Sequence, residues 1–330
     1  MLSKVKKKVH RYFKIDDIKA TRVLAETHSD HLMHIVNQNA RNEVQSSLAL
    51  TDIKLALGRI ESRQVSTISS ASINDREFKV FSQWGEDGII QFLISSITAI
   101  PKRFIEFGVE DYQESNTRFL LMNNNWSGLV FDGAASNIEK IQQADLYWRY
   151  DLTAIQAFIT AENINSLIEQ AGFDGEVGLL SIDIDGNDFY IWEAITCIDA
   201  AVVILEYNHR YGDTKELTIP YKPKFVRSKA HYSMVYAGAS LALLAKLGEK
   251  KGYDLVGTAT NGNNAFFIKK ELRPAYIKKL SPKEAFHQGK FREARDKDGN
   301  LTFISLDEEY KILESLPLIN PFDKNKGHAK

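Results

Sequence analysis

Short apolar runs alternate with helical stretches between about residues 75 and 270, and this alternation predicts a parallel sheet with crossover helices. We expect strands at 104–107, 128–132, 177–183, 201–207, 253–258 and 265–268. We expect helices at about 86–97, 115–124, 136–144, 153–171, 187–196 and 238–251. The last two apolar runs are separated by a segment with Asn261 and Gly262, a pair typical of hairpins. The pattern therefore predicts an α/β fold whose sheet is mostly parallel, with one antiparallel strand near the edge.

The first 70 residues follow a different pattern, because residues 20–65 contain no proline and a single glycine. An apolar spacing of three, four and three residues is typical of a coiled-coil seam. It is formed by Leu50, Ile53, Leu57 and Ile60, is extended by Leu32 and Val36, and is interrupted by Asn39, Glu43 and Ser46. The segment is a helix or helical hairpin that either self-associates or packs on the core. We expect a homo-oligomer formed through these N-terminal helices.

Three regions follow from these patterns. Residues 1–70 form a helical extension, 75–275 form the α/β domain, and 276–330 form a C-terminal extension. The Ser/Thr-rich stretch 64–75 is typical of a linker between the first two regions. The charged tail from Asp323 onward is expected to be disordered.

Composition narrows the function classes. The apolar share of 44% and the charged share of 26% are ordinary for a globular protein, and the net charge of −1 predicts no nucleic-acid partner. A single cysteine, Cys197, excludes an internal disulfide and favours a cytoplasmic location. No apolar run is long enough to span a membrane, and the N-terminus lacks the apolar core of a secretory signal.

Basic residues are concentrated in residues 1–19, where seven Lys and Arg residues face two aspartates. Apolar residues recur at helical spacing in the same stretch, which predicts a short basic amphipathic helix. Such a helix either lies on an anionic membrane surface, here the inner face, or is a solvated terminus.

Ligands of open α/β sheets bind beyond the carboxyl ends of the strands, so the residues that end each expected strand are the candidate site. The first strand ends at Glu106 and Gly108 without the Gly-x-Gly-x-x-Gly pattern of dinucleotide sites. An acidic turn suits a ligand with a cationic amino or sulfonium group. The second strand ends at Asp132, where Rossmann-like folds hold ribose hydroxyls. Asp151 either contacts an adenine amino group or caps the next helix.

The residues that end the expected strands 177–183 and 201–207 give the clearest indication of chemistry. Asp183 and Asp185 follow one apolar run, and Glu206, Asn208 and His209 follow the next. Neighbouring carboxylates are costly unless a metal, a cation or a shared proton relieves them. Their oxygens suit Mg²⁺ or another hard divalent cation, and also a general base. The alternative is a structural hydrogen-bond network.

Two further patterns bear on this site. The spacing from Asp183 is superficially like that of a calcium loop, but position 12 is Ala194 instead of glutamate, which excludes an EF-hand. The stretch 218–232 is long and irregular, and such loops often act as substrate lids.

Taken in order, these segments resemble the FkbM-like group of class I S-adenosylmethionine-dependent methyltransferases, from about Phe81 to Ile268. The resemblance is carried by Ser82-Gln83-Trp84-Gly85-Glu86-Asp87-Gly88, Phe104-Ile105-Glu106-Phe107-Gly108 with Ser115-Asn116-Thr117, Leu129-Val130-Phe131-Asp132-Gly133, Ile182-Asp183-Ile184-Asp185-Gly186 and Asn264-Ala265-Phe266-Phe267. The usual Gly-x-Gly turn is reduced here to Gly108.

The resemblance implies a Rossmann-like class I methyltransferase core and methyl transfer to an oxygen, on a carbohydrate-type acceptor of a polysaccharide or natural product. It implies S-adenosylmethionine bound by Gln83, Glu106, Gly108, Asn116 and Asp132. Asp183 is the expected further contact to the cofactor or to a metal.

Some metal-dependent O-methyltransferases place an acid at the end of strand four and an acid with an asparagine at the end of strand five. Asp183, Glu206 and Asn208 are similar, so a divalent cation such as Mg²⁺ is expected there. Asp185, Glu206 and His209 are the candidate catalytic residues.

Two other function classes fit the same residues. One is a non-catalytic, membrane-associated scaffold with a degenerate methyltransferase fold, although unpaired buried carboxylates without a use would cost stability. The other is a metal-dependent hydrolase that uses Asp183, Asp185 and Glu206, although the sequence lacks a histidine-rich ligand set.

Overall fold

The computed structural model describes residues 33–39, 41–42, 45–70 and 72–323. The chain divides into two compact units, Met1–Ala56 and Leu57–Lys330. The described residues of the first unit are helical, and residues 45–65 are described as one helical stretch. The predicted helical segment before the α/β domain is therefore confirmed for these residues.

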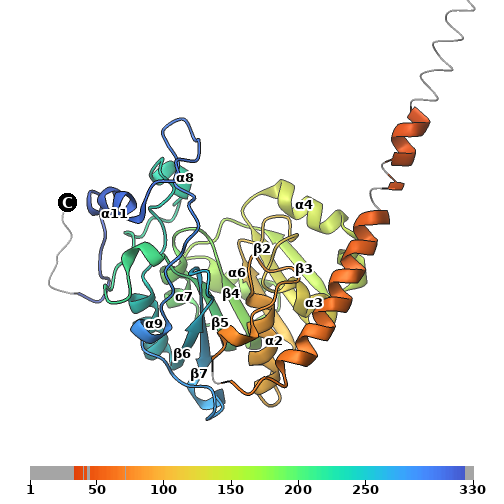
Figure 1. Ribbon diagram of the computed structural model, residues 1–330, viewed down its shortest axis with the longest axis horizontal. Coiled ribbons are helices and arrows are strands. Elements are labelled where there is room, and N and C mark those ends of the chain that lie inside the picture. The colour runs from red at the N-terminus through yellow and green to blue at the C-terminus, as the bar shows by residue number, and fades with distance from the viewer. Residues whose placement is uncertain (1–32, 40, 43–44, 71, 324–330) are drawn as a thin grey trace, which may run out of the picture. The chain divides into compact units, whose positions relative to one another are not determined.

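Seven strands of the described chain form one sheet in the order β3-β2-β1-β4-β5-β7-β6 (Figure 1). They are β1 (Arg103–Phe107), β2 (Ser127–Asp132), β3 (Leu152–Gln156), β4 (Gly175–Ile182), β5 (Ile198–Glu206), β6 (Tyr253–Thr258) and β7 (Asn264–Lys269). All pairings are parallel except those of β7, which runs antiparallel to both β5 and β6. This order and direction confirm the predicted Rossmann-like fold of the class I methyltransferases, with its antiparallel strand beside the edge.

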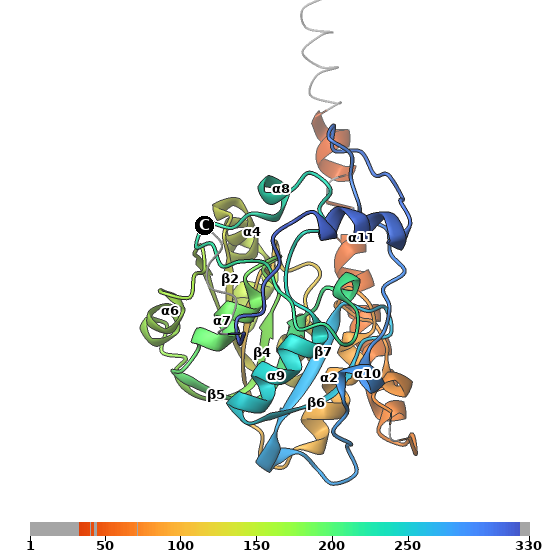
Figure 2. The same cartoon turned by 90° about the vertical axis from the view of Figure 1, so that its left-hand side faces the viewer.

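Helices cover both faces of the sheet (Figure 2). One face packs against α6 (Ile164–Gln170), α7 (Asp188–Ala194) and α9 (Leu241–Lys251). The other packs against α2 (Glu86–Ser96), α3 (Arg118–Asn124), α4 (Ala135–Gln143) and α5 (Asp145–Arg149). The bounds of α9 follow local sequence signals. The Ser240 hydroxyl accepts a hydrogen bond from the Leu243 amide at its start, and Gly252 ends it in the left-handed conformation.

The strands are apolar on both faces because both faces are buried. Successive residues of a strand point to opposite sides. In β1, for example, Phe104 packs with α2 and α3, whereas Ile105 and Phe107 pack on the side of α6 and α7. This accounts for the near-continuous apolar runs by which the sequence identified the strands.

The strand register aligns the residues that follow the central strands. Phe107 pairs with both Phe131 and Ile182, and Ile182 pairs with Leu205. The next residues along each strand are therefore side by side at one edge of the sheet. These residues are Gly108, Asp132, Asp183 and Glu206.

The segments after β5 and β7 form a smaller apolar cluster, which includes Tyr211, Ile219, Val235, Tyr236 and Leu313. The short helices here are η2 (His209–Tyr211), α8 (Arg227–Ala230), η3 (Lys270–Leu272), α10 (Pro282–Ala285) and α11 (Leu306–Glu314), and η1 (Asn74–Arg76) precedes α2. The predicted C-terminal extension thus contains ordered helices that belong to the same compact unit as the sheet.

The helix predicted at 153–171 is wrong in its first half. Residues Leu152–Gln156 form β3, which pairs in parallel with β2, and the helix α6 begins only at Ile164. The stretch is ambiguous in sequence because its buried residues alternate over only five positions. Pairing with the exposed edge of β2 decides in favour of a strand.

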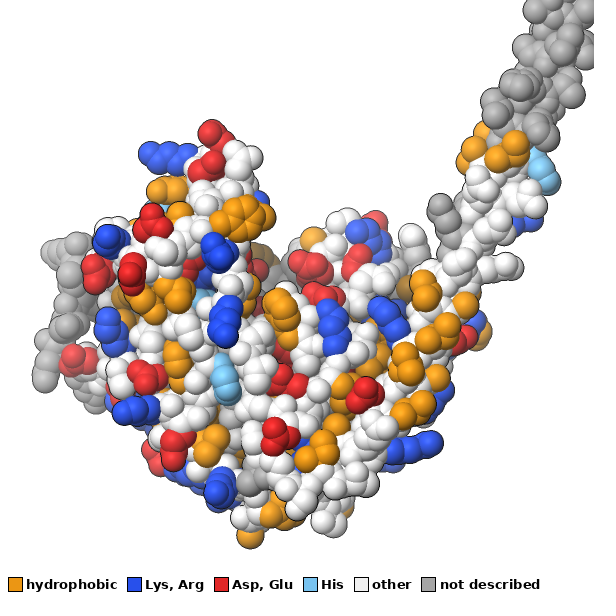
Figure 3. Space-filling view, viewed as in Figure 1, with side chains coloured by type: hydrophobic (Ala, Val, Ile, Leu, Met, Phe, Trp, Pro, Cys, Tyr) orange, Lys and Arg blue, Asp and Glu red, His pale blue; other side chains and the backbone are white. Residues whose placement is uncertain are grey.

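The basic helix predicted within residues 1–19 and the disordered tail predicted after Asp323 lie outside the described residues. Within the part of the chain that the structure describes, no helix combines the length and apolar character needed to cross a membrane. On the face shown in Figure 3, basic and acidic side chains are intermixed.

Two residues of the predicted coiled-coil seam, Leu57 and Ile60, are 57% and 49% exposed. Another face of the same helix packs closely on the α/β unit, because a Cβ at Gly58 would lie 2.6 Å from Val80 Cγ2. If the seam mediates self-association, lysines at both positions would place charge in an apolar contact and convert the oligomer into a monomer. Light scattering after gel filtration measures this. Trp148→Lys, at an exposed position elsewhere, is the control, and an unchanged mass in the double variant would contradict the prediction.

Candidate functional site

A cavity of about 890 Å³ lies at the carboxyl ends of β1, β2, β4 and β5. The chain leaves β1 toward β2 on one side and reaches β4 on the other, so the cavity lies at the point where strand order reverses. Its volume falls in the range of roughly 300–1,000 Å³ found for small-molecule sites. This is the candidate active site.

The lining of this cavity is strongly acidic. Among the described residues, one arginine, Arg227, faces eight carboxylates, which are Glu106, Glu110, Glu114, Asp132, Asp183, Asp185, Glu206 and Glu293. Such a lining attracts a cationic ligand and repels phosphate. It therefore favours a sulfonium or ammonium compound over a dinucleotide.

Gly108 turns the chain at the end of β1, with a φ of +75°. A Cβ at this position would lie 1.7 Å from the carbonyl oxygen of Asp183, so the backbones of the two loops approach as closely as glycine allows. Both the conformation and the approach require glycine here. Gly108 thus sets the floor of the cavity between β1 and β4.

Glu106 is buried and organises the loop before α3. Its carboxylate accepts hydrogen bonds from the Ser115 hydroxyl, from the Asn116 amide at 2.9 Å and from the amide and hydroxyl of Thr117. Burial raises the pKa of Glu106, and these hydrogen bonds oppose that rise. The predicted residues Glu106 and Asn116 are therefore brought together, and Glu106 positions Asn116 at the cavity wall.

Asp132 ends β2 and also lines the cavity. One carboxylate oxygen accepts the amide of Glu110 at 2.9 Å, and the other accepts the Ala134 amide at 2.8 Å and Asn137 Nδ2 at 3.0 Å. These contacts fix its orientation and leave acceptor capacity for a ligand hydroxyl. Gln83, another predicted cofactor residue, also lines the cavity.

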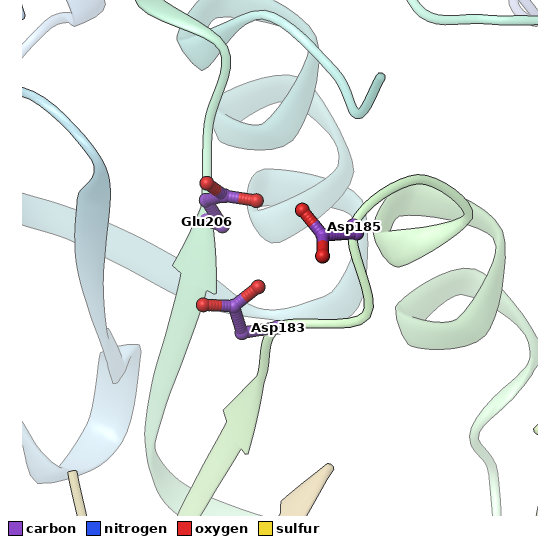
Figure 4. Close-up of side chains that lie close together, drawn as sticks. All are labelled: Asp183, Asp185 and Glu206. Carbon is purple, nitrogen blue, oxygen red and sulfur yellow. The ribbon is translucent and has the colours of Figure 1, made fainter. Parts of the chain in front are cut away.

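Three carboxylates converge where β4 and β5 end. Figure 4 shows Asp183, Asp185 and Glu206 directed toward one another, and each offers an oxygen within 4.8 Å of the others. Burial raises the pKa values of Asp183 and Glu206 well above their ordinary range, and their mutual repulsion adds to this shift. We call these three residues the acid cluster.

Arg227 of α8 neutralises part of the acid cluster. Its guanidinium contacts Asp185 at 2.6 Å and is also paired with Glu293. Its Nε donates to the carbonyl oxygen of Met234. The predicted long loop is therefore joined to the cluster through a largely buried arginine.

Asp188 differs from the acid cluster although it lies beside it. Its two oxygens accept the amides of Ile184 and Gly186, each at 2.9 Å, and so hold the turn that presents Asp185. Burial raises the pKa of Asp188 to about 6. Asp185 itself has a φ of +57°, a strained conformation of the kind found at functional sites.

Three predicted site residues lie outside the cavity lining. Asp151 stands before the first residue of β3, at the opposite end of that strand, and its carboxylate accepts the Ser127 hydroxyl. The Asn208 amide turns away to the carbonyl oxygens of Val235 and Ala237. The prediction failed for Asp151 because β3 went unrecognised, so the carboxyl end of that strand was misplaced.

His209 is 1% exposed and does not line the cavity. Its Nδ1 is hydrogen-bonded to Gln288, and its ring packs edge-on against Phe291. Burial and the neighbouring Arg210 lower the pKa of His209 to about 3. It is held as a neutral structural residue behind the wall of the site.

Several residues of the cavity were not identified from the sequence. They are Trp84, Phe158, Phe225, Arg227, Asn263, Asn264, Phe291 and Glu293. Phe158 could have been found by recognising β3, because it follows the carboxyl end of that strand. The residues of the C-terminal segment carry no local motif that marks them.

Glycine at position 108 should be irreplaceable. In Gly108→Ala, the positive φ and the 1.7 Å contact combine, so we expect the free energy of unfolding to fall by roughly 2–5 kcal/mol. Gly172→Ala is the matched control, because its φ is +69° but nothing lies within 4 Å of the added Cβ. It should lose about 1–2 kcal/mol. Urea denaturation measures both, and equal losses would contradict the close approach.

The acid cluster should reduce stability above the raised pKa values. Because Asp183 and Glu206 have raised pKa values in the folded state, that state binds more protons, and stability falls as pH rises through the interval. Asp183→Asn and Glu206→Gln should therefore raise the free energy of unfolding at pH 8. The gain should shrink as pH falls toward the ordinary pKa of about 4.

Asp188→Asn is the matched control for these substitutions. An amide cannot accept both backbone N–H groups, so this variant should lose about 1–3 kcal/mol at pH 8. Urea denaturation at pH 5 and pH 8 compares the three variants. A loss of stability at pH 8 in both cluster variants would contradict the repulsion within the cluster.

No family model matches the chain, and no curated protein matches it. Solved structures with a similar fold include the N-terminal domain of EvdMO1 with SAH bound, with 10% identity and a TM-score of 0.36 over 64% of this chain and 94% of that one. They include an O-methyltransferase from Bacillus cereus in complex with SAH, with 11% identity and a TM-score of 0.38 over 65% and 89%.

A third is an S-adenosylmethionine-dependent methyltransferase from Clostridium acetobutylicum ATCC 824, with 10% identity and a TM-score of 0.36 over 56% of this chain and 89% of that one. At these values the likenesses carry no argument about the site or its substrate. The class I methyltransferase fold of this chain rests on its own strand order and directions.

Proposed function

We propose that this protein is an S-adenosylmethionine-dependent O-methyltransferase that acts on a sugar hydroxyl and uses a divalent cation held by Asp183, Asp185 and Glu206. One observation carries the proposal. The acid cluster lies in the same cavity as the glycine turn after β1 and the carboxylate after β2. A methyl donor and a hydroxyl acceptor would therefore both bind in this cavity.

The methyl donor fits the part of the cavity above β1 and β2. Asp132 offers acceptor oxygens for ribose hydroxyls, and Gly108 lines the cavity without a side chain that would occupy it. Phe158 provides an apolar surface after β3. The acidic lining suits the positive charge of the sulfonium.

The donor set of the acid cluster fits a hard divalent cation. Three carboxylate oxygens within 4.8 Å of one another match the oxygen ligands of Mg²⁺ or Mn²⁺. The raised pKa values of Asp183 and Glu206 indicate that their charges are poorly compensated by the protein itself. A bound divalent cation would lower the pKa of the acceptor hydroxyl.

The chain's residues then orient the acceptor and take up its proton. The acceptor oxygen forms a bond to the methyl carbon, the sulfur–carbon bond breaks with its electron pair left on sulfur, and S-adenosylhomocysteine results. The hydroxyl proton passes to a carboxylate oxygen of the acid cluster that the cation leaves free. Holding the two reactants in line supplies much of the rate.

The aromatic lining of the cavity favours an acceptor molecule that is a hydroxyl-rich ring. Trp84 and Phe291 are stacked with ring centroids 6.3 Å apart, and both line the cavity with Phe225. Aromatic surfaces combined with a few fixed polar groups are typical of small-molecule sites. The carboxylates nearby accept hydrogen bonds from hydroxyls and repel an anionic acceptor.

Removal of the acid cluster should separate donor binding from methyl transfer. In Glu206→Ala we expect calorimetric affinity for S-adenosylhomocysteine to stay within about threefold, because the donor is held above β1 and β2. Transfer of labelled methyl groups to a panel of glycosides should fall at least about 100-fold. Asp183→Ala should lose transfer to a similar extent, and EDTA should abolish it.

The control for this experiment is Glu176→Ala, an exposed acid at the other end of β4. If the wild type binds neither S-adenosylmethionine nor its product, the proposed activity is overturned. If EDTA leaves transfer unchanged, the cation is overturned and the methyltransferase stands. Product formed without S-adenosylmethionine would instead indicate a hydrolase.

A further inference from the structure

A buried asparagine adjoins the acid cluster from the antiparallel strand. Asn264 is the first residue of β7 and pairs in register with Glu206, the last residue of β5. Directly opposed residues of an antiparallel pair share a face, with Cβ atoms about 4.5–5.5 Å apart. Both residues line the cavity. The Asn264 and Glu206 side chains therefore leave the sheet side by side on the same face.

The orientation of this amide is fixed by a second buried acid. Asn264 Nδ2 donates to Glu86 Oε1 at 2.9 Å. Glu86 is fully buried, and its other oxygen accepts the Trp84 amide at 2.9 Å. Both Glu86 oxygens thus act as acceptors, and it is the nitrogen of the Asn264 amide that faces Glu86. The amide oxygen consequently points away from Glu86.

This oxygen lacks a partner within the described chain. Asn264 is 3% exposed, and its Oδ1 has no hydrogen-bond partner among the described residues. A buried carbonyl oxygen without a hydrogen-bond partner destabilises the fold. The carboxylates of the acid cluster are themselves acceptors and cannot satisfy it while ionised. This oxygen would be satisfied by a hydrogen-bond donor or by a cation.

We propose that Asn264 Oδ1 is a further ligand of the divalent cation held by Asp183, Asp185 and Glu206. The inference rests on the proposed function. Amide oxygens are ordinary ligands of hard cations. Asn264 takes the role that the sequence suggested for Asn208, whose amide is committed to the carbonyl oxygens of Val235 and Ala237.

The charges of the site agree with a neutral fourth ligand. Three ionised carboxylates carry three negative charges, of which a divalent cation offsets two, and Arg227, which pairs with both Asp185 and Glu293, offsets part of the rest. Another acid in place of Asn264 would leave an uncompensated charge beside the buried Glu86. An amide supplies an oxygen without that cost.

The test measures Mn²⁺ binding to the full chain in the absence of S-adenosylmethionine, by calorimetry and by the electron paramagnetic resonance signal of free Mn²⁺. Asn264→Ala should weaken Mn²⁺ affinity at least about tenfold. Its affinity for S-adenosylhomocysteine should stay within about threefold, which verifies the fold. Asn263→Ala is the matched control, because Asn263 is also buried in the cavity lining but is not opposite Glu206.

Glu86→Gln tests the orientation independently. With its amide oxygen on the Trp84 N–H, the new glutamine turns its amide nitrogen toward Asn264 and favours a flipped Asn264 amide whose Oδ1 faces position 86 instead of the cluster. Mn²⁺ affinity should therefore also fall although no proposed ligand is removed. If Asn264→Ala does not fold, Asn264→Ser, which keeps a polar side chain too short to reach the cluster, provides the same comparison.

Mn²⁺ affinity that is equal in the wild type and in the Asn264 variants would overturn the inference and leave the proposed function intact. If Mn²⁺ does not bind the wild type, both the cation site and the role of Asn264 are overturned. If the wild-type protein transfers methyl groups without binding Mn²⁺, the proposed methyltransferase activity stands without the cation site and without a role for Asn264.

Discussion

Repulsion between the three clustered carboxylates at the ends of β4 and β5 is the constraint around which this site is built. The parallel register of β4 and β5 places Asp183 and Glu206 on adjacent strands one residue beyond the last paired positions, so neither can move away without breaking the sheet. The turn after β4 adds Asp185 to the same space. Within the described chain, Arg227 is the basic residue that offsets this charge directly. The fold therefore fixes a site with an affinity for positive charge.

The acidic residues in and around this site fall into two kinds, distinguished by the groups that donate hydrogen bonds to them. Glu106 and Asp188 accept several N–H or O–H groups each, and they hold loops in place. Asp183 and Glu206 have carboxylates directed at one another and at Asp185. Desolvation raises the pKa in both kinds, so a raised pKa alone does not separate them. The hydrogen-bond donors that surround each carboxylate do separate the two kinds.

The sequence predicted most of the fold because buried strands of a parallel sheet appear as continuous apolar runs. For the same reason it located Asp183 and Glu206, since both directly follow such runs. It missed β3, whose five residues gain their strand character from pairing with β2. It pointed to Asn208 as the metal-binding amide, and not to Asn264, because Asn208 lies close to Glu206 in the sequence. Nothing local shows that the Asn208 amide is taken by a segment 27 to 29 residues later, or that an antiparallel strand returns Asn264 to Glu206.

The C-terminal segment explains how an acid-rich cavity can exist in a stable fold. Arg227 links Asp185 to Glu293, and Arg210 links Glu293 to the buried Glu309 of α11. Charge at the end of β4 is thus continuous with a network that reaches the last described helix. A buried pair such as Arg210 and Glu309 adds little stability by itself, but loss of one partner would leave an uncompensated charge. The segments that follow β5 and β7 therefore complete the wall of the site and hold the Arg227 guanidinium against Asp185.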